Sequence, residues 1–247
     1  MRLTVVGCGD AWGSNGSGHS CFRLDMDGRV YVVDFGASAI VAWHRLGFST
    51  DEIDAVFISH LHGDHFGGLP FALLNAQYET RRKKPLLIVG PPGVEQRLTD
   101  ALDVFYPGLR ARGWRFKLTV EELIPGSSRK ALDANLTSVP VLHGGLVDGS
   151  ALRVEAGGKI FAYSGDTEWT DALIDVSAGA DLFVVECFSA SREIVGHLNW
   201  PRLQSNLRRF SARRVAITHM GPAMRLRADD ARHAGLTVLE DGQIIEF

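Results

Sequence analysis

The sequence contains, at residues 59–68, the segment SHLHGDHFGG. This segment places three histidines and an aspartate within six positions, directly after the strand-like apolar run of residues 53–58. Imidazole nitrogens and carboxylate oxygens are the ligands that zinc and similar metals take. The glycines allow the backbone to fold closely around such a cluster. A histidine-rich surface loop is the alternative interpretation, but four ligand-type side chains at the end of a buried strand favour a metal site.

The spacing within this segment favours two neighbouring metal ions over one. His60 and His62 point to the same side if the backbone is extended, because side chains alternate along a strand. Asp64 and His65 follow where the chain can turn into a helix, so they can point to different metal positions. Two ions need more ligands, and further ligand-type residues follow apolar runs, although each alone could be a capping or buried hydrogen-bonded residue: His143, Asp166 and His219.

The overall composition restricts the class of protein. The chain has 247 residues, enough for one large domain or two small ones. Its 26 Lys and Arg against 29 Asp and Glu give a formal net charge of −3, whereas a general nucleic-acid binder carries a basic excess. We interpret the basic run Arg81–Lys84 as a solvated loop. Three cysteines without a C-x-x-C pair argue against a disulfide framework and suit a reducing compartment.

The sequence also carries expectations about location and assembly. No signal-like segment precedes the first predicted strand, and no apolar run approaches the ~20 residues of a membrane span. We therefore expect a cytoplasmic protein. The sequence leaves the oligomeric state open, a homodimer included.

Strand-like runs recur along the chain, with helix-like segments between several of them. The dipeptides Asp27-Gly28 and Asp241-Gly242 each separate two strand-like runs and predict β-hairpins. Strands followed by helices occur in the first half, and the second half repeats that order. Two sheets packed face to face, with helices outside, would bury these runs. The predicted helices span residues 37–46, 68–77, 94–105, 170–176, 201–210 and 228–234.

The order of these motifs resembles that of the metallo-β-lactamase superfamily, over essentially the whole chain. The motifs are HLHGDH at residues 60–65, then His143, SGDT at residues 164–167 and TH at residues 218–219. The resemblance implies one α/β domain over residues 1–247 with a four-layer αβ/βα sandwich fold. It implies two divalent metal ions, with zinc expected and manganese as the alternative. The implied ligands are His60, His62 and His143 for one ion and Asp64, His65 and His219 for the other, with Asp166 bridging.

A further histidine points to one branch of this superfamily. The segment GHLN at residues 196–199 resembles the extra histidine of the phosphodiesterase branch, which includes ribonuclease Z and the cyclic phosphodiesterases of phosphonate breakdown. In that branch the histidine contacts the phosphate and assists departure of the leaving alcohol. Without a function, His197 would be an ordinary loop or helix-start histidine. The glycine-rich residues 7–14 are similar to the first loop of the branch, whose backbone N–H groups could line the substrate side. The alternative is an ordinary turn, which a G-x-G pair also allows.

Two departures from the branch narrow the substrate. The interval between His143 and Asp166 holds only a short loop and a predicted hairpin, so the tRNA-holding arm of ribonuclease Z does not fit there. Together with the net charge, this argues against tRNA as a partner. In addition, Cys8, His19 and Cys21 do not form a convincing equivalent of the cysteine-bound zinc of the phosphonate enzyme.

The resemblance therefore implies a dinuclear metal-dependent hydrolase, namely a phosphodiesterase that acts on small phosphodiesters by attack of metal-bridged hydroxide. Asp64 and His197 are the expected catalytic residues, because Asp64 would orient the hydroxide and His197 would protonate the leaving oxygen. One alternative is a lactone or thioester hydrolase on the same metal cage. The other is a non-catalytic metal-binding accessory protein, although such proteins tend to lose ligands.

Several residues near the predicted site have two possible interpretations. Asp34 follows a predicted strand and either hydrogen-bonds a ligand imidazole or caps the next helix. Glu186 could position His197 in the same way. Tryptophans near the site could wall a pocket for the organic part of the substrate or pack in the core: Trp12, Trp169 and Trp200.

Overall fold

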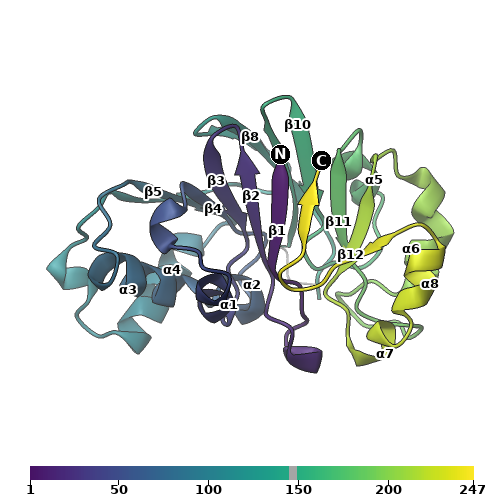
Figure 1. The fold of residues 1–247 in the computed structure, drawn as a ribbon, viewed down its shortest axis with the longest axis horizontal. Coiled ribbons are helices and arrows are strands. Elements are labelled where there is room, and N and C mark those ends of the chain that lie inside the picture. The colour runs from purple at the N-terminus through teal and green to yellow at the C-terminus, as the bar shows by residue number, and fades with distance from the viewer. Residues whose placement is uncertain (145–148) are drawn as a thin grey trace.

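The computed structural model describes residues 1–144 and 149–247, which form two seven-stranded sheets. Figure 1 shows these sheets in the centre of the molecule, with helices on both outer sides and the two chain ends near each other. Within the described residues, no helix is long and apolar enough to cross a bilayer.

The first sheet has the strand order β14-β1-β2-β3-β4-β5-β6, and the second has the order β13-β12-β11-β10-β9-β8-β7. The strands of the first sheet are β1 (Arg2–Gly7), β2 (Cys21–Met26), β3 (Arg29–Val33), β4 (Ala55–Phe57), β5 (Leu86–Gly90), β6 (Leu118–Glu122) and β14 (Ile244–Glu246). Those of the second are β7 (Ser128–Ala131), β8 (Ala134–Pro140), β9 (Ser150–Ala156), β10 (Lys159–Tyr163), β11 (Leu182–Glu186), β12 (Val215–Thr218) and β13 (Thr237–Val238).

The helices divide between the two outer layers. The α-helices of the first half are α1 (Ala39–Arg45), α2 (Gly63–Phe66), α3 (Leu69–Tyr78) and α4 (Val94–Phe105). Those of the second half are α5 (Ala172–Ser177), α6 (Trp200–Asn206), α7 (Pro222–Arg225) and α8 (Ala228–His233).

Hydrophobic clusters fill the spaces between the layers. Between the sheets, Phe22 of β2 packs on Tyr163 of β10 with ring centroids 5.1 Å apart. Trp43 of α1 belongs to a cluster on the outer face of the first sheet, and Leu203 of α6 to one on the outer face of the second. Each sheet is buried on both faces, which requires helices outside and a shared core inside. The predicted four-layer αβ/βα sandwich is therefore confirmed.

The two predicted hairpin turns have different outcomes. Asp27 and Gly28 have φ values of 50° and 76° and join the antiparallel strands β2 and β3, as predicted. The prediction for Asp241-Gly242 is wrong, because β13 pairs with β12 in the second sheet while β14 pairs with β1 in the first. The chain crosses between the sheets at this point. The Asp241 carboxylate accepts a hydrogen bond from the N–H of Cys8 and so ties the crossing to the end of β1.

The solvated-loop interpretation of residues 81–84 is wrong for Arg82, whose exposed fraction is 1%. Its guanidinium donates hydrogen bonds of 2.6 to 2.9 Å to the backbone carbonyls of Thr50, Ile53, Lys84 and Pro85. A planar group with five N–H donors can satisfy several loop carbonyls at once. Arg82 therefore joins two loops inside the protein.

The predicted helices all occur, with bounds that differ by a few residues. The segment expected to turn before a helix is itself helical, because α2 begins at Gly63 and includes Asp64 and His65. The sequence analysis missed β6 and β7, whose sequences LTVEE and SRKA lack a long apolar run. Both strands lie at sheet edges, where half-exposed polar residues are tolerated.

Candidate active site

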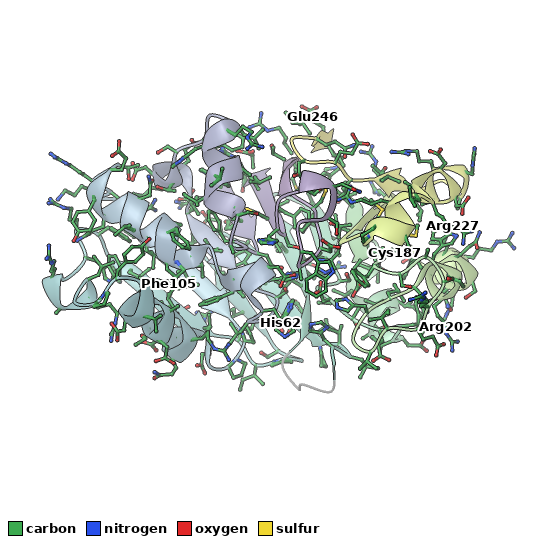
Figure 2. All side chains as sticks on the ribbon, turned by 90° about the horizontal axis from the view of Figure 1, so that it is seen from below. His62, Phe105, Cys187, Arg202, Arg227 and Glu246 are labelled. Atoms are coloured by element: carbon green, nitrogen blue, oxygen red, sulfur yellow. The ribbon has the colours of Figure 1, made fainter. Side chains whose placement is uncertain are left out.

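The predicted ligand residues follow the carboxyl ends of strands. His60 comes shortly after β4, Asp166 after β10 and His219 directly after β12. These strands are parallel to their neighbours β3 and β11, so their ends open at one edge of the sandwich, where open α/β sheets bind ligands. Figure 2 is a view from below in Figure 1 and labels His62 near the middle of this edge.

Two groups of ligand-type side chains meet at this edge, and the ligand atoms of each group lie within 4.8 Å of one another. All of them except His62 are buried. Oδ2 of Asp166 lies 3.9 Å from Nε2 of His60 and 3.3 Å from Nε2 of His219, so this carboxylate faces both groups. The first group is His60, His62 and His143, and the second is Asp64, His65, Asp166 and His219.

Outer hydrogen bonds orient the imidazoles. Nδ1 of His65 lies 2.6 Å from Oδ2 of Asp34, and Nδ1 of His143 lies 2.7 Å from the carbonyl oxygen of Gly196. Because those acceptors fix the proton on Nδ1, Nε2 is the nitrogen of each ring left to bind an ion. In His143 this Nε2 lies 2.9 Å from Nδ1 of His62, another predicted ligand. Nε2 of His65 faces the centre of the second group, 3.3 Å from both Asp64 and Asp166.

Several ligand atoms in this cluster are buried without a hydrogen-bond partner among the described residues. They include Nε2 of His60, Nε2 of His65 and Oδ1 of Asp166. Buried polar atoms are almost always satisfied in folded proteins, so ligand atoms that converge without partners fit a bound cation. The donor set of imidazole nitrogen and carboxylate oxygen fits zinc or manganese.

The charges at the site suit a divalent ion. Burial lowers the pKa of His219 to about 4, which keeps this imidazole neutral. Burial alone would raise the pKa of Asp64, but the adjacent His65 holds it well below its ordinary range. For His65 burial acts in the opposite direction and would lower the pKa. Asp166 and the other anionic groups around His65 outweigh burial and raise its pKa. An ion bound there would displace the proton of His65, as metal binding generally does.

His197 lies beside this cluster. Its ring is nearly parallel to that of His219, at an angle of 11° and a centroid distance of 5.5 Å. Nδ1 of His197 lies 3.0 Å from Oε1 of Glu186, which ends β11 and is fully buried. Burial opposes the charge on His197, but the hydrogen bond and charge of Glu186 raise its pKa to about 9. Burial raises the pKa of Glu186 to about 7. The pair therefore holds a proton at neutral pH.

The structure distinguishes between the two interpretations of Asp34. Its carboxylate accepts hydrogen bonds from the N–H and hydroxyl of Ser59 and contacts His65. The N-cap of α1 is Ser38, and no side chain caps that helix. Asp34 therefore orients the imidazole of His65, a predicted ligand. Asp34 has a φ of 57°, a strained value for a residue other than glycine, which its buried hydrogen bonds maintain.

The sequence analysis missed two residues that act through the backbone or a hydroxyl. Gly196 accepts the His143 hydrogen bond through its carbonyl oxygen, and a Cβ at Gly196 would lie 2.6 Å from the backbone nitrogen of Gly144. Ser59 fixes Asp34. Each precedes a singled-out histidine by one position, which is the only signal that the sequence offers for them.

For the glycine-rich first loop, the structure favours an ordinary turn over a lining of free N–H groups. Its N–H groups are largely used inside the protein: Gly9 donates to the carbonyl of Gly18, and Ser14 to the carboxylate of Asp10. The N–H of Cys8 donates to Asp241. These N–H groups are not free for a substrate. The loop instead serves as a scaffold beside the site, and Cys8 also accepts the N–H of His219 on its carbonyl oxygen.

The three tryptophans lie in different environments. Trp200 is 1% exposed and packs in the core, as a single tryptophan usually does. Trp12 is 76% exposed. Trp169 is half-buried and lines a cavity together with His197.

Solved structures of other proteins share this fold over the whole chain. Human tRNase Z, short form, superposes with a TM-score of 0.81 over 100% of this chain and 99% of that chain, at 22% identity. A diphosphatase of the PhnP family superposes with a TM-score of 0.77 over 100% of this chain and 97% of that chain, at 18% identity. The fold and the site are those of a metal-dependent phosphodiesterase of the metallo-β-lactamase superfamily, as the sequence predicts.

Within that superfamily, the chain matches one particular family. The model of the family described as Anti-Pycsar protein Apyc1 matches residues 1–245, and the chain belongs to this family. An Anti-Pycsar protein Apyc1 from Bacillus phage vB_BveM-Goe7 is 28% identical over 222 residues, which cover 83% of this chain and 86% of the relative. A ribonuclease Z from Methanothermobacter thermautotrophicus is 24% identical over 271 residues, with coverages of 89% and 86%.

Proposed function

We propose that this phosphodiesterase hydrolyses small cyclic nucleotides with two bound divalent metal ions. Zinc is the expected metal. The observation that carries the proposal is the pairing of His197 with Glu186 beside the two ligand groups. A lactone has no phosphate for such a histidine to contact. Membership of the Apyc1 family supports a cyclic nucleotide over other small diesters.

The two ligand groups would hold one ion each. When bound, two such ions supply an acidified water and stabilise charge on the phosphoryl oxygens. His60, His62 and His143 would hold one ion; Asp64, His65 and His219 would hold the other; and Asp166 would serve both.

The protein's own side chains would move the protons. The carboxylate of Asp64 is ionised and can accept a hydrogen bond from the attacking water, which orients it. Water adds to phosphorus and the ester P–O bond breaks. His197 then donates its proton to the leaving alkoxide, so the product is a nucleoside monophosphate. Glu186 would keep His197 oriented and protonated until that moment.

Hydrolysis assays on the metal-loaded protein test the proposal. Cyclic nucleotides, a lactone, a thioester and a precursor tRNA are compared with Zn²⁺ and with Mn²⁺. We expect cyclic nucleotides to have the highest kcat/KM and precursor tRNA to be cut poorly or not at all. The outcome that contradicts the proposal is a lactone, thioester or correctly cleaved tRNA that exceeds every cyclic nucleotide. A protein that binds metal and hydrolyses none of them would instead be the accessory protein.

A further inference from the structure

His219 differs from the other buried histidines of the two ligand groups in how its ring is held. In His60, His65 and His143, Nδ1 lies 2.6 to 3.1 Å from an oxygen atom of another residue. Nδ1 of His219 is also buried, but it has no hydrogen-bond partner among the described residues. The orientation of the His219 ring therefore depends on the backbone that carries it and on the packing around it.

The backbone at His219 has a conformation that needs support. Its φ is 56°, in the left-handed region that residues other than glycine rarely adopt and that persists only where surrounding contacts hold it. The N–H of His219 donates to the carbonyl oxygen of Cys8 at 3.0 Å, and the hydroxyl of Thr218 reaches the same oxygen at 3.4 Å. The Cys8 carbonyl therefore helps to fix the direction in which the His219 ring points.

Cys8 lies just beyond the strand that leads to it. The pairing of β1 with β2 ends at Gly7, after an irregularity between Val5 and Gly7. The N–H of Cys8 thus lies past the end of this ladder, and it donates to Oδ1 of Asp241 at 3.0 Å. Oδ2 of the same carboxylate accepts the N–H of Gly18 at 2.6 Å. Asp241 therefore holds both limbs of the loop that joins β1 to β2.

Asp241 reaches this loop from a distant part of the sequence. It lies on the crossing from β13 to β14, which Figure 1 shows in yellow, passing the lower end of β1. Hydrogen bonds from backbone N–H groups to a carboxylate are stronger than those between neutral groups. An aspartate at this point can therefore hold Cys8 more firmly than a neutral amide side chain could.

We propose that Asp241 is a positioning residue for the second ligand group and acts on His219 through the backbone of Cys8. The path consists of two hydrogen bonds, from the Cys8 N–H to the carboxylate and from the His219 N–H to the Cys8 carbonyl. Outer contacts of metal ligands set their orientation and so the affinity for the ion. The inference rests on the two-ion site of the proposed function, and it concerns the ion that Asp64, His65 and His219 would hold.

The test replaces Asp241 with asparagine and measures zinc affinity. Asparagine has nearly the same size but a single oxygen acceptor, so the N–H of Cys8 or of Gly18 would face an NH₂ group. Titration of the purified protein with Zn²⁺ against a chelator gives a dissociation constant for each ion. We expect the constant of one ion to rise by about 10- to 100-fold and that of the other ion to stay unchanged.

The adjacent carboxylate on the same crossing supplies a matched control. Glu240 is exposed, and its carboxylate lies 3.2 Å from Nη2 of Arg232 on α8. Glu240→Gln therefore removes one negative charge beside Asp241 without removing a contact to the loop after β1. It should change neither zinc constant.

A double variant shows through which residue Asp241 acts. His219→Ala removes a predicted ligand and identifies which of the two constants belongs to the second group. When His219→Ala is already present, Asp241→Asn should have no further effect on the affinity for either ion, because no ring remains to be positioned. A residue that supports the fold in general would instead add its own loss to that of His219→Ala.

The possible failures are distinguishable. Zinc constants in Asp241→Asn equal to those of the wild type would overturn the inference, even if urea unfolds the metal-free variant more readily. An equal loss for both ions would overturn it as well. If Asp241→Asn does not fold, Asp241→Glu, which retains the charge but moves it by one methylene, should show the same loss for one ion only.

The wild type separates this inference from the proposed function. A wild type that binds fewer than two zinc ions would refute the two-ion site, and the role of Asp241 falls with it. A wild type that binds two ions, shows the selective loss in Asp241→Asn and hydrolyses no cyclic nucleotide would refute the proposed substrate and leave the role of Asp241 standing.

Discussion

Nδ1 of His197 lies 3.0 Å from Oε1 of Glu186, and the Glu186 side chain is completely buried. Glu186 also accepts the backbone N–H groups of Thr167 and Phe188, so it is fixed on three sides. The Glu186 contact stabilises the protonated form of His197 and so raises its pKa. This placement beside the predicted metal ligands is what the proposed role of His197 as a general acid requires.

Replacing His197 with alanine should impair hydrolysis according to the leaving group. His197 is outside the seven predicted ligands, so metal content and folding should change little. For cyclic nucleotides, whose leaving alkoxide needs a proton, kcat should fall by about 10²–10⁴-fold. For bis(p-nitrophenyl) phosphate the loss should be much smaller, because p-nitrophenolate departs unprotonated. An equal loss on both substrates, or none on cyclic nucleotides, would remove His197 from the proton-donor role.

Replacing Glu186 with glutamine should change the pH dependence. The pKa of His197 is raised to about 9 by Glu186, so the acid form persists below that pH and activity on cyclic nucleotides should decline above it. Glutamine retains the size of the side chain but removes its charge. The pKa of His197 should then fall toward its ordinary value of 6.5, and the alkaline limb of kcat/KM should move to lower pH. Glu95→Gln, an exposed change on α4, is the control. An unmoved limb in Glu186→Gln would contradict the role of this pair.

Replacing Asp166 with alanine should remove most of the bound metal. The wild type should carry close to two ions per chain, and Asp166 faces both ligand groups. Elemental analysis of purified protein measures this directly. Asp175→Ala, an exposed carboxylate on α5, should keep both ions. A folded and active wild type without metal would refute the two-ion site.

Replacing Asp34 with asparagine should weaken metal binding without removing any ligand. Asp34 holds Nδ1 of His65 at 2.6 Å and so fixes the orientation and basicity of that ring. Loss of such an outer contact costs about 10- to 100-fold in metal affinity. Titration against a chelator gives the dissociation constant, and circular dichroism checks the fold. An unchanged constant would show that Ser59 and packing orient His65 without the carboxylate.

Local spacing was sufficient to predict four of the seven metal ligands. His60, His62, Asp64 and His65 lie so close in sequence that no fold could separate them widely. For His143, Asp166 and His219 the evidence was a polar residue at the end of an apolar run, and only the family resemblance joined them to the others. The role of Asp34 was not decidable, because it depends on the pairing of β3 with β4, which places Asp34 beside Ser59.

The sequence by itself therefore determined the ligand chemistry and the four-layer fold, and it singled out His197 as a candidate. Tertiary structure alone decided which groups those residues contact. Asp27-Gly28 and Asp241-Gly242 show the physical reason, since the same turn residues make a hairpin in one place and a crossing between sheets in the other. Turn propensity depends on a few neighbouring residues. The pairing of a strand depends on which sheet edge lies beside it after folding. The burial of Arg82 and the cavity beside Trp169 depend in the same way on segments that meet only after folding.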